Sequence, residues 1–185
     1  MGLLIGICLI FISFLFYARL QFAYIILLVS GILTSTTSAL IIIFSKDTLK
    51  LKLLWLGIIL LFVLIQRFSE PMIIDCSYKI YLLQHDGALD RINTLLLSTP
   101  GKITITKDTI IDSQNQLSSI QKDNLKKLRK EVNAYIIEKT EGVIYYGLWG
   151  MLDVRLAVVY YPKEKTTNNS DRKITKHWYE KQSGG

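Results

Sequence analysis

The 185-residue chain has few of the residues that build covalent frameworks or catalytic centres: two cysteines, two histidines and three prolines. The cysteines are Cys8 and Cys76. Because Cys8 lies within an apolar run, we expect no disulfide between them. A chain without a disulfide framework is compatible with a reducing compartment but does not require one.

Most catalytic signatures are absent as well. The sequence has no glycine-rich phosphate loop, no GxSxG motif, and no cluster of cysteine, histidine and carboxylate residues at metal-ligand spacing. With His85 and His177 as the two histidines, metal and triad chemistry have few candidates. We therefore expect no cofactor and no metal site, and the sequence favours a non-enzymatic protein.

Charged residues are scarce in residues 1–68, which are apolar except for breaks at 17–21 and 45–52. A stretch with no water-facing side cannot form the core of a small soluble domain, so it predicts a membrane anchor. We expect about three transmembrane helices, and the alternative is two spans with a re-entrant or interfacial first segment. The expected spans are 2–18, 21–44 and 51–66.

The second expected span carries small and hydroxyl side chains. Ser30, Thr34 and Ser38 share one helix face, and Gly31 and Ser35 form a small-xxx-small pair beside them. These residues predict either close packing among helices of one chain or a self-association face that lines a path through a homo-oligomer. No Asp, Glu or His lies within a span, which argues against a proton relay or ion-coupled transport.

The distribution of basic residues supports two opposite orientations of the chain in the membrane. Lys46, Lys50 and Lys52 in the short loop favour a cytosolic loop and an external C-terminal tail. The missing disulfides and the basic tail favour a cytosolic tail, which is the orientation we expect. The first segment has the length of a signal-peptide core, but no basic residue precedes it and no clear cleavage site follows, so we expect a retained anchor.

Residues 70–182 are long enough for one compact domain, and residues 183–185 look like an appended linker. The hydrophobic pattern predicts a small α+β domain, an antiparallel sheet with two helices on one face. Pro71 is expected to end the third helix. Residues 75–83 are expected to form a strand, and the alternative is the start of a longer helix. A turn at 86–87 and a helix at 88–97, stopped by Pro100-Gly101, are expected to follow. The remaining expected elements are a strand at 102–106, a helix at 117–137 whose buried stripe includes Ile120, a hairpin over 143–161 turning near 150–151, and an edge strand at 174–179.

The expected helix at 117–137 has a basic side, and the chain has a net charge of +7. Such a surface can attract anionic lipid headgroups or RNA, and the alternative is a solvated lysine-rich face. The candidate polyanion-binding residues are Lys122, Lys126, Lys127, Arg129 and Lys130.

One catalytic constellation remains, an R-x4-H motif formed by Arg172 and His177. In this arrangement a histidine can perform acid–base chemistry on an RNA phosphate while an arginine stabilises the developing charge. The alternative is a surface arginine and an interfacial histidine next to Trp178.

A short multi-pass membrane protein with a C-terminal R-x4-H motif resembles the membrane accessory protein of type VI-B CRISPR systems, a family described as HEPN-like. The resemblance implies a homo-oligomer in the bacterial inner membrane that permeabilises or depolarises the membrane in anti-phage defence. It also implies RNA or an RNA-guided nuclease complex as a further partner. The alternatives are a membrane-tethered ribonuclease that uses Arg172 and His177, and a non-catalytic interaction or immunity protein.

The expected α+β domain departs from the all-helical HEPN domain, which speaks against nuclease activity but not against action on a membrane. A second resemblance is to small uncharacterised membrane proteins and lipoproteins of Bacteroidota. It rests on the stretches at 89–93, 101–105 and 177–179.

Overall fold

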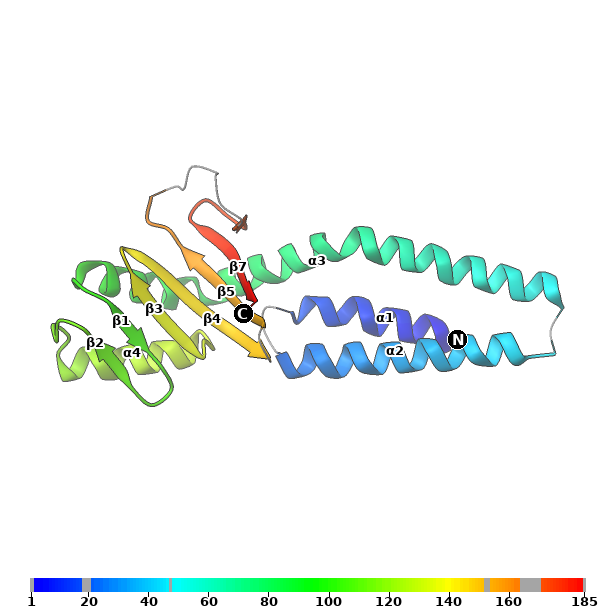
Figure 1. The fold of residues 1–185 in the computed structure, drawn as a ribbon, viewed down its shortest axis with the longest axis horizontal. Helices are drawn as coiled ribbons and strands as arrows, with labels where there is room; N and C mark the ends of the chain where they lie inside the picture. The colour runs from blue at the N-terminus through cyan, green and yellow to red at the C-terminus, as the bar shows by residue number, and fades with distance from the viewer. Residues whose placement is uncertain (1, 18–20, 47, 152–153, 164–170, 185) are drawn as a thin grey trace. The chain divides into compact units, whose positions relative to one another are not determined.

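Figure 1 shows the fold in a computed structural model, with helices in the first part of the chain and a sheet with helices in the second. The chain divides into two compact units, Met1–Tyr78 and Lys79–Gly185. The residues that the structure describes are 2–17, 21–46, 48–151, 154–163 and 171–184.

The first unit contains α1 (Gly2–Leu15), α2 (Gln21–Phe44) and the beginning of α3 (Leu49–Ser98). α2 has 24 residues and α3 has 50, which correspond to lengths of about 36 and 75 Å. Both contain an apolar stretch long enough to cross a membrane. α1 has 14 residues, about 21 Å, which is short of a hydrocarbon core of roughly 30 Å. Of the three expected spans, two therefore lie on helices that meet the length requirement.

α3 continues through positions where the sequence predicts a break. Pro71 lies inside α3, and the strand expected at 75–83 and the turn expected at 86–87 are both helical. The expected strand and turn were wrong, and the alternative, a longer helix, is what the structure shows. A short alternation of apolar residues is also part of a longer stripe with helical spacing. The buried members of this stripe are Tyr78, Tyr81, Leu82, Leu89, Ile92 and Leu96. α3 ends at Ser98, before Pro100-Gly101, as predicted.

The second unit is built on one antiparallel sheet of seven strands, in the order β2-β1-β3-β4-β5-β7-β6. The end of α3 and α4 (Ser119–Glu131) accompany it. This confirms an antiparallel sheet with helices. The strands are β1 (Ile103–Ile105), β2 (Ile110–Asp112), β3 (Ile136–Thr140), β4 (Val143–Met151), β5 (Val154–Tyr160), β6 (Arg172–Lys173) and β7 (Trp178–Gly184).

The strands near the C-terminus differ from the prediction in their bounds. The hairpin over 143–161 is confirmed as β4 and β5. The last strand begins at Trp178, and it is an interior strand because β6 pairs with it on its outer side. Ser183 and Gly184 pair with β5, so these two residues of the expected linker belong to the sheet. The positions of interior strands depend on long-range pairing, which a local pattern does not contain.

α4 is shorter than the helix predicted at 117–137. Ser118 caps its N-terminus, where the Ser118 and Gln121 side chains form a reciprocal capping box. It ends before Asn133, whose φ of 52° is left-handed. Ile120, expected in the buried stripe, is 80% exposed. The residues after Asn133 leave the helix and enter β3.

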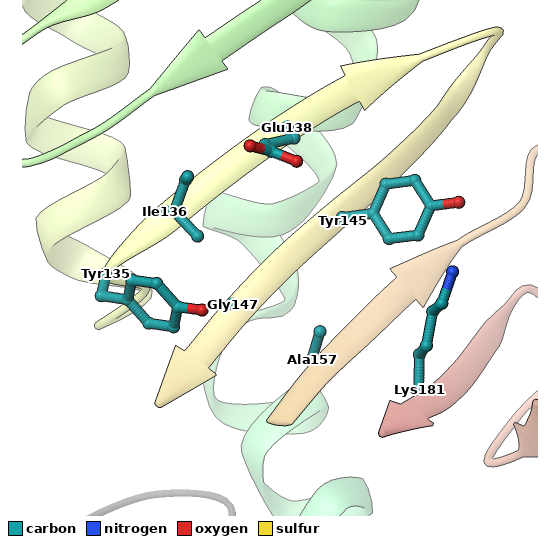
Figure 2. Close-up of a pocket in the computed structure, with 7 residues that line it drawn as sticks. All are labelled: Tyr135, Ile136, Glu138, Tyr145, Gly147, Ala157 and Lys181. Carbon is teal, nitrogen blue, oxygen red and sulfur yellow. The ribbon is translucent and has the colours of Figure 1, made fainter. Parts of the chain in front are cut away.

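The two faces of the sheet have different environments. In β3, Ile137 and Lys139 are buried on the face that packs on the helices, whereas Ile136 and Glu138 face the opposite way. Buried hydrogen bonds hold the helices to each other and to the sheet: Tyr81 Oη donates to Val132 O and Tyr146 Oη to Asn93 Oδ1, each at 2.7 Å. Burial raises the pKa of both phenols. The face away from the helices is the one seen in Figure 2.

Candidate functional site

The small residues predicted as a packing or oligomer face lie at the contact between α1 and α2 of the same chain. A Cβ atom added to Gly6 would be 2.8 Å from Gly31 O, and one added to Gly31 would be 2.7 Å from Gly6 O. The same contact includes Ser35, whose backbone N would be 2.7 Å from a Cβ at Gly6. Of the two alternatives, this arrangement favours packing within one chain for Gly31 and Ser35.

The hydroxyl groups of α2 mostly contact atoms of α2 itself or of α1. Thr34 Oγ1 donates to the carbonyl of Ser30 at 2.8 Å, one turn earlier in α2. Ser38 Oγ lies against Gly2 of α1, where an added Cβ would be 2.6 Å away. The Ser35 hydroxyl is buried without a hydrogen-bond partner. The predicted face of Ser30, Thr34 and Ser38 therefore lies partly against α1.

Arg172 and His177 lie on a strand and in the turn that follows it, not on helices. Arg172 is in β6, and its Nη1 is 3.6 Å from the buried carboxylate of Glu180 in β7. His177 precedes β7, and its Nδ1 is 3.0 Å from the carbonyl oxygen of Tyr161. A carbonyl only accepts hydrogen bonds, so this contact assigns the proton to Nδ1. Each side chain is thus positioned by its own structural partner.

The basic residues of α4 are divided between structural and solvent-exposed roles. Arg129 Nη1 donates to the Ala134 carbonyl just beyond the end of α4, at 2.5 Å. Lys122 Nζ is 3.4 Å from Asn115 Oδ1. Lys126, Lys127 and Lys130 are exposed and remain available for an anionic partner.

Asp112 fixes the connection between β2 and α4, a role that the sequence analysis did not predict. Its carboxylate accepts the backbone N–H groups of Leu117 at 2.8 Å and Gln114 at 3.1 Å. Burial tends to raise the pKa of Asp112, but these hydrogen bonds and the nearby Lys122 outweigh it and lower that pKa. An Asx-type turn before a Ser-capped helix is the local signal that could have identified this residue.

We expect Asp112→Asn to lower the free energy of unfolding at neutral pH and to lower it less at acidic pH. The folded-state pKa of Asp112 lies below its unfolded value of 3.8, so its stabilising effect is present above pH 3.8 and is lost as the pH falls through the folded-state pKa. Thermal melting followed by circular dichroism across this range measures the effect. The exposed Asp108→Asn is the matched control, and a pH-independent difference would contradict this role of the charge.

Lys139 is a second polar residue that the sequence analysis missed. It is 6% exposed, and its Nζ donates to the carbonyl of Thr99 just beyond the C-terminus of α3. Burial lowers the pKa of Lys139, and the negative charge of Asp112 opposes this shift. A cation beside the carbonyl groups at a helix C-terminus is favourable, so Lys139 joins β3 to the end of α3.

A groove of about 290 Å³ lies on the face of the sheet away from the helices (Figure 2). Gly147 and Ala157 are directly opposite each other in β4 and β5, and Ala157 is opposite Lys181 in β7. The residues that line the groove are Tyr135, Ile136, Glu138, Tyr145, Gly147, Ala157 and Lys181. It joins aromatic rings, a carboxylate and an ammonium group on one surface, which suits binding of a small ligand.

Among the described residues, no group of three or more histidine, cysteine, aspartate or glutamate side chains could hold a metal ion. Comparisons with protein families, curated proteins and solved structures find no match to the chain. Conclusions about function therefore depend on the residues and geometry described above.

Proposed function

We propose that this chain is a multi-pass protein of the bacterial inner membrane, anchored by α2 and the first part of α3, with its second unit in the cytosol. The observation that carries the proposal is the exposure of apolar side chains along both helices. In α2, Leu33 is 63% exposed, and in α3, Leu60 is 62% exposed. Neither apolar stretch is buried like the core helix of a soluble protein. Hydrocarbon is the environment that favours such surfaces.

The loop between α2 and α3 is consistent with this placement. Lys52 Nζ donates to the carbonyl of Ile43 in the last turn of α2, at 2.8 Å. Because the last carbonyls of a helix carry partial negative charge, a lysine there is favourable. Lys46 and Lys50 lie in the same region and would meet anionic headgroups at a membrane surface.

The proposed activity is permeabilisation or depolarisation of that membrane by a homo-oligomer. The first turns of α3 are apolar on every side: Leu53, Leu54, Leu56, Leu60 and Leu61 are exposed on one side, and the residues on the other side, Trp55, Ile58, Ile59 and Phe62, are half-buried. A helix that is apolar all round requires lipid or other helices on every side, and further copies of this chain can provide them. A role in anti-phage defence extends this proposal and rests on the resemblance to the type VI-B accessory protein.

Reconstitution of the full-length protein tests the activity. Lipid vesicles that contain a self-quenching dye should release it when the purified chain is incorporated, and mass photometry in mild detergent should show a discrete oligomer. Intact vesicles with an incorporated monomer would contradict permeabilisation. Extraction of native membranes with alkaline carbonate tests the anchor separately, because an integral protein stays in the pellet.

A pair of matched variants tests whether the hydroxyl face of α2 lines a conducting path. Thr34→Val removes the hydroxyl group at nearly constant volume, and we expect it to lower conductance in planar bilayers if the face contributes to the path. Thr37→Val is the control on the exposed side of the same helix. Equal conductance in wild type and both variants would remove this face from the proposed path.

A further inference from the structure

The groove on the open face of the sheet has the small side chain of Ala157 at its centre, while Gly147 is covered by the side chains of Tyr135 and Ile136. Gly147 and Ala157 are cross-strand neighbours in β4 and β5, and of the two only Ala157 is partly exposed. A Cβ added to Gly147 would lie 2.6 Å from Ile136 Cγ2 and 2.7 Å from Tyr135 Cε1. Glycine at this position therefore lets the Tyr135 ring pack directly against the strand backbone. The open part of the floor is therefore Ala157, whose methyl group leaves room for a planar molecule beside the Tyr135 ring.

Two tyrosine rings border this floor (Figure 2). Tyr135 is 41% exposed although one side of its ring packs against Gly147. Tyr145 has the Lys181 ammonium 5.0 Å from its ring centroid. Exposed aromatic rings on an open antiparallel sheet are the surface on which proteins stack nucleobases.

The charged groups of the groove are not paired with each other. Within the described part of the chain, the Glu138 carboxylate forms no ion pair and accepts no hydrogen bond, and the Lys181 ammonium has only its contact with the Tyr145 ring. Glu138 and Tyr145 are directly opposite each other in β3 and β4. A ligand that offers hydrogen-bond donors to Glu138 and an anion to Lys181 would match both groups.

We propose that this groove binds a guanine nucleotide. The base lies over Ala157 against the rings of Tyr135 and Tyr145, the Glu138 carboxylate accepts its donors, and Lys181 binds its phosphate. A carboxylate accepts two parallel N–H groups well, and guanine presents such a pair, N1–H and N2–H, on its Watson–Crick edge. Adenine, cytosine and uracil have no two adjacent donors on that edge, so a carboxylate that bonds their one donor meets an acceptor with its second oxygen.

The size of the groove sets what part of a nucleic acid can enter it. A volume of about 290 Å³ lies at the lower end of the range for small-molecule sites, which suits one nucleotide. The guanine could belong to a free nucleotide or to a single-stranded RNA, because both present the same base and phosphate chemistry. This site is independent of the proposed permeabilisation, and either can be wrong without the other.

Equilibrium dialysis of radiolabelled GMP against the full-length protein in lipid nanodiscs tests the proposal, with empty nanodiscs as the blank. We expect saturable binding of GMP and binding of AMP at least about tenfold weaker, since a hydrogen bond to a charged group is worth about that factor or more. IMP, which lacks the 2-amino group, should fall between them. A short single-stranded RNA with one guanine and the same RNA with adenine distinguish the two sources.

Substitutions identify the residues that carry the specificity. Glu138→Gln should weaken GMP binding about tenfold and remove the preference over AMP, while Glu141→Gln in the following turn should change neither. Tyr145→Leu should weaken both nucleotides about tenfold through loss of stacking. Lys181→Met should weaken GMP, with exposed Lys102→Met as its control. Thermal melts confirm that each variant is folded.

Binding of GMP that depends on Glu138 supports the proposal. Binding of the guanine-containing RNA without binding of GMP also supports it, if that binding depends on Glu138, and it then identifies RNA as the source of the base. The proposal is overturned by the absence of binding to both probes at millimolar concentration. It is equally overturned by equal affinity for GMP and AMP, or by a folded Glu138→Gln protein that retains full GMP preference.

Discussion

Gly31→Leu should prevent α1 and α2 from packing together and strongly lower the yield of folded protein. A Cβ at this position would lie 2.7 Å from Gly6 O and 2.9 Å from Ile10 N, and both are backbone atoms that cannot move aside without separating the helices. Leucine adds further atoms in the same direction. We expect a loss of several kcal/mol, at the upper end of the range for overpacking a buried contact.

Gly57→Leu is the matched control for this experiment. It places the same side chain on an apolar helix, but at a glycine with no heavy atom within 4 Å of the added Cβ. Yield after detergent extraction and resistance to limited proteolysis compare the two variants. If both lose yield equally, the effect arises from leucine in an apolar helix and not from the contact between α1 and α2.

Tyr146→Leu should be the most destabilising single change in the second unit. Tyr146 is 0% exposed, contacts the Trp178 ring at a centroid distance of 5.5 Å, and donates its hydroxyl proton to Asn93 at 2.7 Å. The substitution opens a cavity and leaves a buried amide oxygen without a donor, two costs that together reach about 3–5 kcal/mol.

A second variant separates the two costs. Tyr146→Phe keeps the ring and removes only the hydrogen bond, so it should cost about 1–3 kcal/mol. Tyr145→Phe is the control at the neighbouring position. Its ring faces the open groove, so this substitution should change the free energy of unfolding little. Chemical denaturation of the full-length protein in detergent measures all three, and equal stability of Tyr146→Phe and Tyr145→Phe would contradict a structural role for the Asn93 bond.

The sequence predicts the parts of this structure that depend on local pattern. The apolar stretches of α2 and α3, the helix stop before Pro100-Gly101 and the hairpin of β4 and β5 are local signals, and each appears at or near its expected position. The expected strand at 75–83 was wrong because period two and period 3.6 coincide over a few residues, and the stripe that extends to Leu96 decides between them.

The candidate sites were harder to predict because cross-strand pairing brings their residues together. Glu138, Gly147 and Lys181 carry no motif, and they share one face only because β3, β4, β5 and β7 are adjacent in the sheet. Lys139 appears in sequence as one more surface lysine, although it is buried against the end of α3. The placement of Arg172 beside Glu180 likewise depends on the pairing of β6 with β7.

The hydrogen bond between Lys139 and Thr99 joins residues that are synthesised at different times. Thr99 leaves the ribosome 40 residues before Lys139, and Asn93 leaves it 53 residues before its partner Tyr146. During synthesis, which proceeds from the N-terminus, the end of α3 therefore emerges before the strands that complete it. If α2 and α3 enter a membrane as proposed, they are available for insertion while the sheet is still unmade, and insertion would come before folding of the domain that follows.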